Sequence, residues 1–429
     1  MSSLPQRAPI LDDLAARGLI HDSTDRSELS ALLQSGPVSL YYGCDPTADS
    51  LHAGNLIGLL ILRRFQLAGH QPIALAGGAT GMIGDPSGRS DERNLLDAAT
   101  LARNVEKISE QLSRFIDFEA GDARAELVDN ATWTAGVSLI DFLRDVGKHF
   151  TVNQMVAKES VRSRMDSDNG ISYTEFSYML LQANDFAWLH EQRGCVLQIG
   201  GSDQWGNITA GIDLIRKRFA HTAHGFTWPL MTRADGTKFG KSMGENVWLS
   251  AHRTSPYRFY QYWIQSDDRD VEKFLLQLTM LSVNDVRAVI DAHSVAPERR
   301  EAQRVLAREV TGLVHGAAAV AAAEEATAIV FGTVDEPSEA ALESLVDEIP
   351  TTRLERASFD GGMTAVDLLV AAGVVTSKGE GRRLLTQGGA TVGGLRLDVA
   401  ASIGSSDLRC GRFLLVRKGK RQVHLVVAE

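Results

Sequence analysis

The sequence predicts a chain of mixed α/β class: an open parallel sheet with helices on both faces, then a set of helices, then a small α+β module. Short apolar strands that end in glycine alternate with helical patterns over about the first 220 residues, which is typical of such a sheet. From about Thr254 helical patterns follow alone, and the last segment turns to strands with tight glycine turns. The 429 residues exceed what one core usually fills, so two or three domains are expected.

The first strand–helix–strand unit begins near residue 38. VSLYYG (38–43) is typical of a buried strand, AGNLIGLLILRRFQLAG (53–69) of a helix, and QPIALAGGA (71–79) of a second strand that ends in glycines. The same pattern returns at CVLQIGGSDQWGN, where a helix is expected to start near Asn207. The first domain is therefore predicted to be Rossmann-like, with its ligands at the carboxyl ends of the strands.

Three loops at the predicted strand ends carry glycine together with polar residues, and they are expected to converge on one crevice: 43–55, 77–88 and 200–207. In the first loop, His52 and Asn55 fall at the start of a helix, where unpaired N–H groups and the helix dipole favour an anion. Gly54 permits close approach there. The alternative is that Ser50 or Asn55 caps the helix and His52 packs beneath it.

A second stretch rich in glycine and lysine lies far along the chain, at TRADGTKFGKSMG (232–244). Lys238 and Lys241 are three residues apart, with Gly240 between them and Ser242 following. Such a loop is expected to be mobile, and its ammonium groups could close over a polyphosphate. The alternative is that these lysines are simply solvated.

A polar stripe marks the predicted helix in SYTEFSYMLLQANDF. Ser172 and Glu175 are expected to form a capping box, which places Tyr178, Gln182 and Asp185 on one face of the helix. Apolar residues flank this face, so the polar stripe is unusual for a core and for open surface and favours a ligand pocket. An ordinary amphipathic helix is the alternative.

Composition excludes several classes of protein. The net charge of −10 argues against a protein that coats nucleic acid nonspecifically. Three cysteines without CxxC spacing disfavour a disulfide framework and a structural zinc site. The N-terminal stretch carries charges where a signal peptide would be apolar, and no later stretch reaches membrane-spanning length, so a cytoplasmic protein is expected.

Four parts are predicted along the chain. The Rossmann-like domain covers 1–225, the KFGKS loop and the helices cover 226–332, an acidic linker covers 333–360, and a small α+β domain covers 361–429. Residues 376–429 contain ten Lys or Arg and four Asp or Glu, a positive excess that favours a surface facing nucleic acid. A solvated basic face that binds nothing is the alternative.

Taken together, these stretches resemble the class I aminoacyl-tRNA synthetases, and specifically the bacterial tyrosyl-tRNA synthetases. HAGN stands where that family has its HIGH signature, and KFGKS stands where it has KMSKS. The resemblance continues through YYGCDPTADSLHAGN, GGATGMIGDPSGR, FLRDVGKHFTVNQMVAKESV, SYTEFSYMLLQANDF and LQIGGSDQWGNITAG, over essentially the whole chain. It implies that tyrosine attacks the α-phosphorus of ATP to give tyrosyl-adenylate, and that tyrosine then moves to the 3′ end of its tRNA.

The resemblance also implies a role for each candidate residue of the first domain. The residues implied to bind tyrosine are Tyr41, Asp85, Tyr178, Gln182 and Asp185. Those implied to bind ATP are Asp45, Gly54, Asp203, Gln204, Lys241 and Ser242. The implied catalytic residues are Thr47, His52, Asn55, Lys238 and Lys241. No side chain needs to act as nucleophile, so catalysis is expected to rest on positioning and on hydrogen-bond donors. Mg²⁺ would arrive with ATP, and no tightly bound, protein-ligated metal is expected.

The end of the chain resembles the S4-type RNA-binding module of the same family, above all in TSKGEGRRLLTQGGATVGG. Its candidates for tRNA phosphate contacts are Lys378, Arg382, Arg383, Lys418 and Lys420. The family further implies a homodimer, with the contact expected within residues 132–165.

Two other functions remain open. The first is a tryptophanyl-tRNA synthetase, against which Tyr41 paired with Asp185 and the S4-like tail weigh. The second is a synthetase-derived RNA-binding protein without catalysis, against which the intact HAGN and KFGKS motifs weigh.

Overall fold

The structure is a computed structural model that describes residues 9–87, 96–166, 170–234, 239–242, 245–332, 334, 336–419 and 422–429. The chain divides into two compact units. The first comprises Met1–Ser250 and Ser266–Leu306, and the second comprises Ala251–Gln265 and Ala307–Glu429.

Five parallel strands form the sheet of the first unit, in the order β3-β2-β1-β4-β5. Their bounds are β1 Ser39–Cys44, β2 Gln71–Ala76, β3 Glu126–Asp129, β4 Cys195–Gly201 and β5 His224–Trp228. The strand order reverses between β1 and β4, and ligands of such sheets bind outside the carboxyl ends at that point. The predicted parallel sheet is therefore confirmed. Its switch point lies at the carboxyl end of β1, and the loop that follows this end leads to the HAGN stretch at residues 52–55.

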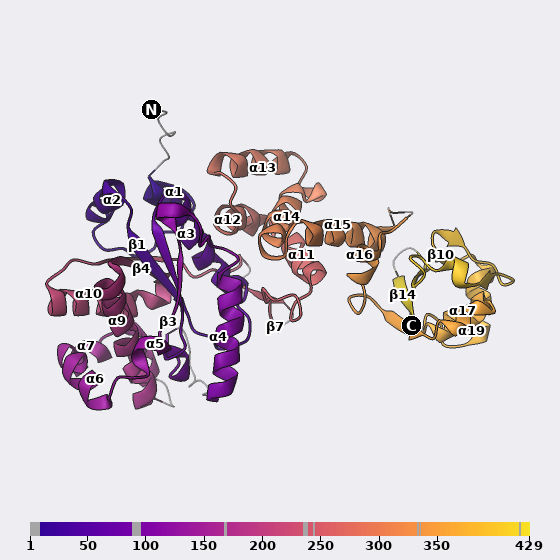
Figure 1. Cartoon of the computed structure of the whole chain (residues 1–429). Helices are drawn as coiled ribbons and strands as arrows, with labels where there is room; N and C mark the ends of the chain where they lie inside the picture. The colour runs from indigo at the N-terminus through magenta and orange to yellow at the C-terminus, as the bar shows by residue number, and fades with distance from the viewer. Residues whose placement is uncertain are drawn as a thin grey trace. The chain divides into compact units, whose positions relative to one another are not determined.

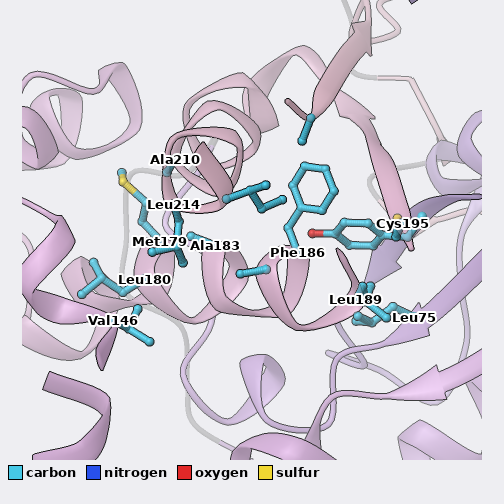
Figure 2. Close-up of a cluster of buried hydrophobic side chains, with 14 of the residues drawn as sticks. Leu75, Val146, Met179, Leu180, Ala183, Phe186, Leu189, Cys195, Ala210 and Leu214 are labelled. Atoms are coloured by element: carbon cyan, nitrogen blue, oxygen red, sulfur yellow. The ribbon is translucent and has the colours of Figure 1, made fainter. Parts of the chain in front are cut away.

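Helices cover both faces of this sheet (Figure 1). On one face lie α3 (Leu56–Leu67) and α4 (Ala98–Leu112), and on the other lie α9 (Tyr173–Arg193) and α10 (Trp205–Phe219). Figure 2 shows Met179 and Ala183 of α9 beside Ala210 and Leu214 of α10 in the core between these two helices. The helix expected near Asn207 begins at Trp205, after a short 3-10 turn.

The start of α9 differs in one respect from the prediction. Ser172 caps the helix, because its hydroxyl accepts a hydrogen bond from the backbone N–H of Glu175 at 3.2 Å. The reciprocal half of the predicted capping box is wrong. The Glu175 side chain is buried and pairs instead with Arg164 at 2.8 Å, and that buried charge pair fixes the start of α9 from within the protein.

The remaining helices of the first unit surround this core. They are α1 Ile10–Ala16, α2 Arg26–Ser35, α5 Ala131–Thr134, α6 Leu139–Asp145, α7 Val152–Val156, α8 Glu159–Met165, α12 Asp268–Leu278 and α13 Val283–Val295. Helix α14 (Glu301–His315) crosses the boundary between the units. None of the helices in the described ranges combines the length and apolarity that a membrane crossing requires.

The second unit is built around another five-stranded sheet, in the order β11-β10-β13-β14-β8. Its strands are β8 Thr351–Leu354, β10 Ala390–Val392, β11 Leu395–Arg396, β13 Phe413–Lys418 and β14 Gln422–Ala428. Successive side chains of β14 point to opposite faces of the sheet and join two different cores. Leu425 and Val427 pack toward α15 (Ala317–Phe331) and α16 (Glu339–Glu343), whereas Val426 and Ala428 join a core that includes residues of α18 (Ala365–Ala371) and α19 (Lys378–Thr386).

The segment 333–360, expected as an acidic linker, contains ordered elements. Besides α16 and α17 (Ala357–Asp360), it holds β8, which pairs in parallel with β14 and so belongs to the C-terminal sheet. Helix α11 (Pro256–Ile264) belongs to the second unit and packs on α15. The predicted division into four parts at residues 225, 332 and 360 stays a prediction.

Candidate active site

The HAGN turn, residues 52–55, follows β1 and leads into α3. His52 Nδ1 accepts a hydrogen bond from the backbone N–H of Gly54, and Asn55 Oδ1 accepts one from the backbone N–H of His52, both at 3.0 Å. These two bonds form a capping box, so His52 and Asn55 do cap the turn, whereas Ser50 donates to the carbonyl of Leu51. Because Nδ1 accepts, a neutral His52 carries its proton on Nε2. Capping is therefore compatible with a donor role for the same residue.

The KFGKS stretch meets the HAGN turn through its backbone. A Cβ atom built on Gly240 would lie 3.6 Å from the backbone nitrogen of Gly54, and Gly240 has a left-handed φ of 78°. The carbonyl of Gly240 accepts from the N–H of Val247 at 2.7 Å, and the carbonyl of Val247 accepts from the N–H of Ala53 at 2.8 Å. Two motifs about 190 residues apart in sequence thus lie side by side.

The lysines of this stretch are only partly described. Lys238 lies outside the described residues, and so do the side chains of Lys241 and Ser242. The backbone of Lys241–Ser242 forms β6, which pairs antiparallel with β7, Glu245–Asn246.

Asp185 of α9 is the centre of a buried group that we call the Asp185 cluster: Tyr41, Asn130, Trp133 and Asp185. One carboxylate oxygen of Asp185 accepts from Trp133 Nε1 and the other from Asn130 Nδ2, both at 2.8 Å. Burial raises the pKa of Asp185 to about 7, although both hydrogen bonds lower it. Trp133 also stacks on Trp188, with ring centroids 4.1 Å apart.

Two polar atoms at this site are buried without a hydrogen-bond partner among the described residues: the hydroxyl of Tyr41 and Oε1 of Gln182. Burial, followed by the nearby charge of Asp185, raises the pKa of Tyr41 well above its ordinary value, so the phenol stays protonated. Unpaired buried polar atoms are costly and uncommon in folded proteins. Their presence beside Asp185 indicates that a polar ligand supplies the missing partners.

A second polar chain joins α9 to the ends of β1 and β2. Tyr178 donates its hydroxyl proton to one oxygen of Asp45 at 2.8 Å, and Thr80 donates to the other at 2.7 Å. A Cβ atom on Gly77 would lie 2.3 Å from Asp45, so glycine is needed there. Thr47, two residues further on, is exposed.

A third group follows β4. Gln204 Nε2 donates to Asp85 at 2.6 Å and, over 3.3 Å, to Asp203. Gln204 Oε1 accepts from Gln182 Nε2 at 3.3 Å, which ties this group to the polar face of α9. Burial, with the charge of Asp85, raises the pKa of Asp203. Hydrogen-bond chains therefore gather Asp85, Tyr178, Gln182 and Asp185 of the implied tyrosine set near the carboxyl ends of the strands, and Tyr41 lies within β1 close to Asp185.

Sequence reasoning missed Thr80, Asn130 and Trp133. Asn130 is fully buried and donates to both Thr80 and Asp185, so it links the Asp185 cluster to the chain around Asp45. Asn130 follows directly after β3, and strand ends of parallel sheets are where ligand-facing polar residues lie, so the sequence would have pointed to Asn130 only if β3 had been recognised as a strand.

The basic candidates of the second unit lie on and beside α19. Arg382 and Arg383 are exposed, and Lys378 is exposed but paired with Asp367 at 2.7 Å. Lys418 is half-buried and held by Glu380 at 3.1 Å. Lys420 lies outside the described residues. Among residues that the structure describes, no group of three or more His, Cys, Asp or Glu side chains is placed to hold a metal ion.

Comparison with known proteins gives concordant results along the chain. Residues 33–332 match the family model of class I tRNA synthetases (W and Y), and residues 341–426 match the tyrosine–tRNA ligase SYY-like C-terminal domain. The tyrosine–tRNA ligase of Opitutus terrae is 54% identical over 420 residues, which cover 97% of this chain and 99% of that protein. That of Bacillus caldotenax is 49% identical over the same shares of both chains.

Solved structures agree with these sequence matches. A C-terminally truncated mitochondrial tyrosyl-tRNA synthetase of Aspergillus nidulans superimposes with a TM-score of 0.69 at 29% identity, covering 76% of this chain and 95% of that one. The corresponding protein of Coccidioides posadasii gives a TM-score of 0.65 at 32% identity, over 74% and 92% of the two chains. This chain therefore belongs to the class I tRNA synthetases of the tryptophan and tyrosine group, and within them to the tyrosine–tRNA ligases of bacteria, which are aminoacyl-tRNA synthetases.

Proposed function

We propose that this chain activates L-tyrosine with ATP to give tyrosyl-adenylate and pyrophosphate, and then transfers tyrosine to the 3′ end of tRNA(Tyr). The observation that carries this proposal is the meeting of three parts at one end of the sheet. The HAGN turn and the backbone of Gly240 lie together, and the polar face of α9 contributes Asp185 to its cluster, in which the Tyr41 hydroxyl has no partner among the described residues.

On the tyrosine side, the phenol of the substrate would donate its proton to Asp185 and accept one from Tyr41. Asp185 already has a donor on each oxygen, so its remaining lone pairs suit another donor and reject a group without one. The amino group would bind among acceptors near Tyr178, Gln182 and Asp85. Tyrosyl-tRNA synthetases are themselves the established example of such rejection, since the class discriminates against phenylalanine by about 10⁵-fold without editing.

On the ATP side, Asp45, Gly54, Asp203 and Gln204 would hold the nucleotide, with Lys241 and Ser242 from the KFGKS stretch. The donors Thr47, His52, Asn55, Lys238 and Lys241 would stabilise charge that grows on the phosphoryl oxygens as pyrophosphate leaves. Magnesium would enter with ATP rather than on a dedicated protein site. No side chain forms a covalent intermediate, so the rate depends on alignment of the tyrosine carboxylate with the α-phosphorus.

The exchange of labelled pyrophosphate into ATP tests this function. Each amino acid is supplied in turn to the full chain, and we expect exchange with tyrosine alone. Exchange driven by tryptophan would indicate the related specificity, and the absence of exchange with any amino acid would indicate a binding protein without catalysis.

For tRNA, we propose that Lys378, Arg382, Arg383, Lys418 and Lys420 contact phosphates. Arg382 and Arg383 carry most of this proposal, since both are exposed on α19, whereas Lys378 and Lys418 are engaged by acidic neighbours. Replacing Arg382 and Arg383 together with alanine should raise the KM for tRNA and lower the salt dependence of tRNA binding by about two charges. Pyrophosphate exchange should not change, because it needs no tRNA.

A homodimer in the cytoplasm completes the proposal. Residues 132–165 are the expected contact, and α6, the residue before its cap and the start of α7 expose several large apolar side chains: Val137, Leu139, Ile140, Leu143 and Val152. Exposed apolar residues that gather on one surface are typical of a protein interface. Sedimentation of the chain and of an Ile140→Asp variant would test it, because a charge there should shift the mass toward that of a monomer.

A further inference from the structure

Two histidines form a contact at the opposite end of the β4 strand from the candidate active site. His190 Nε2 lies 2.9 Å from His221 Nδ1, and His190 Nδ1 lies 2.9 Å from the carbonyl oxygen of Cys195, the first residue of β4. Neither histidine takes part in the proposed reaction.

The protonation of His190 follows from its partners. A carbonyl oxygen can only accept a hydrogen bond, so Nδ1 of His190 carries a proton. In the neutral ring the lone pair is then on Nε2, which faces His221. This is the arrangement that metal-binding histidines show, because a carbonyl that holds one ring nitrogen fixes the tautomer and aims the other nitrogen at the ion.

We propose that His190 and His221 bind one divalent late transition-metal ion of the copper(II) or nickel(II) type, with water completing the coordination. In the present arrangement the two nitrogens share one proton in a hydrogen bond of 2.9 Å, and the ion would take the place of that proton.

The surroundings favour a cation at this place. His190 lies in the last turn of α9, and His221 follows the end of α10, so both rings are at helix C-termini, where backbone carbonyls carry partial negative charge. Phe219 contacts both rings, at 5.6 Å from His190 and 6.3 Å from His221, and limits their orientation.

Two arginines near these helix ends have other partners. Arg193 pairs with Glu126 at 3.0 Å, and the guanidinium of Arg218 lies over the ring of Phe219. The positive charge of each arginine makes binding of a metal cation nearby less favourable. His221 must also turn away from the mutual hydrogen bond and carry its proton on Nε2, so that its Nδ1 lone pair points to the same ion as Nε2 of His190. We therefore expect one site of moderate affinity that excess chelator empties.

Titration of the full chain with Cu²⁺, without a histidine tag, tests the proposal. Calorimetry should show one stoichiometric site per chain, and electron paramagnetic resonance should show two coordinated nitrogens. Cu²⁺ should bind more tightly than Ni²⁺ or Zn²⁺. His221→Ala, at an exposed position, should weaken Cu²⁺ binding by at least about tenfold and leave one nitrogen.

His21→Ala is the matched control, because His21 is also exposed in the first unit and its Nδ1 contacts Asp22. It should leave the copper affinity unchanged. His190→Gln, checked for folding by circular dichroism, should weaken the site as His221→Ala does. Copper affinity that is unchanged in both variants, or no stoichiometric site in the unmodified chain, would overturn the proposal and leave an ordinary hydrogen bond between two imidazoles. Neither result bears on tyrosine activation, which is measured separately by pyrophosphate exchange.

Discussion

The Asp185 cluster and the HAGN turn differ in how their geometry is fixed. In the cluster, Asn130 and Trp133, from a segment more than 50 residues earlier in the chain, each donate to the carboxylate of Asp185. In the turn, His52 and Asn55 bond to backbone groups within the same four residues. The proposed tyrosine site thus depends on tertiary packing, whereas the proposed phosphate site is a turn shaped locally, with one added hydrogen bond from Ala53 to the carbonyl of Val247.

The largest effect should come from the turn. His52→Asn keeps an acceptor near the place of Nδ1 but removes the distal donor, so adenylate formation should slow by about 10²- to 10³-fold with little change in tyrosine affinity. Rapid-quench measurement of a single turnover gives this rate directly.

His52→Gln is the matched variant, since it keeps a distal donor and loses the capping acceptor. It should retain more of the rate and lower the free energy of unfolding by about 1 kcal/mol. A His52→Asn variant as fast as the unmodified chain would assign His52 to capping alone.

The next effect should come from the cluster. Asp185→Asn places an amide NH₂ where both neighbours, Asn130 and Trp133, already present donors, so neither orientation of the new amide satisfies them. Tyrosine affinity should fall by about 10²-fold, as expected for a buried donor left unpaired. Equilibrium dialysis measures this affinity, and ATP affinity, which should not change, is the control. Loss of both affinities together would indicate a collapsed site instead.

A smaller effect should appear with pH. The pKa of Asp185 is raised to about 7 in the unliganded chain, and the phenol of tyrosine donates best to the ionised carboxylate. The carboxylate is mostly protonated at pH 6 and mostly ionised at pH 8, so tyrosine affinity should rise with pH over this range, by about tenfold. Asp185→Asn should abolish the rise. A rise that persists in that variant would belong to another group.

The smallest effects should come from Tyr41→Phe, for which stability and tyrosine affinity should change in opposite directions. Tyr41→Phe removes a buried hydroxyl that lacks a partner among the described residues, so the unliganded chain should gain up to about 1 kcal/mol in free energy of unfolding. Tyrosine, which would lose a donor, should bind several-fold more weakly. Urea unfolding and tyrosine titration give the two values, and a variant weakened in both would show that the hydroxyl has a structural partner.

The same contrast explains what the sequence could predict. The parallel sheet was predictable because glycine lies at or directly beside the ends of β1, β2 and β4, and the two motifs were predictable because each is a local string. Asn130 and Trp133 were not, because β3 is a strand of four residues with mixed burial and does not look like a strand in sequence. The role of Glu175 also depended on Arg164, which only the folded chain brings to it.

The stack of Trp133 on Trp188 has a practical consequence. The indole N–H of Trp133 donates to Asp185, while its ring lies against a second indole at 4.1 Å. A phenol that donates a hydrogen bond to the Asp185 carboxylate would change the electric field at this pair of indole rings. The chain has six tryptophans, and this pair is coupled directly to the recognition carboxylate. If tyrosine binds at Asp185 as proposed, intrinsic fluorescence can follow its arrival in real time, without a label on either molecule.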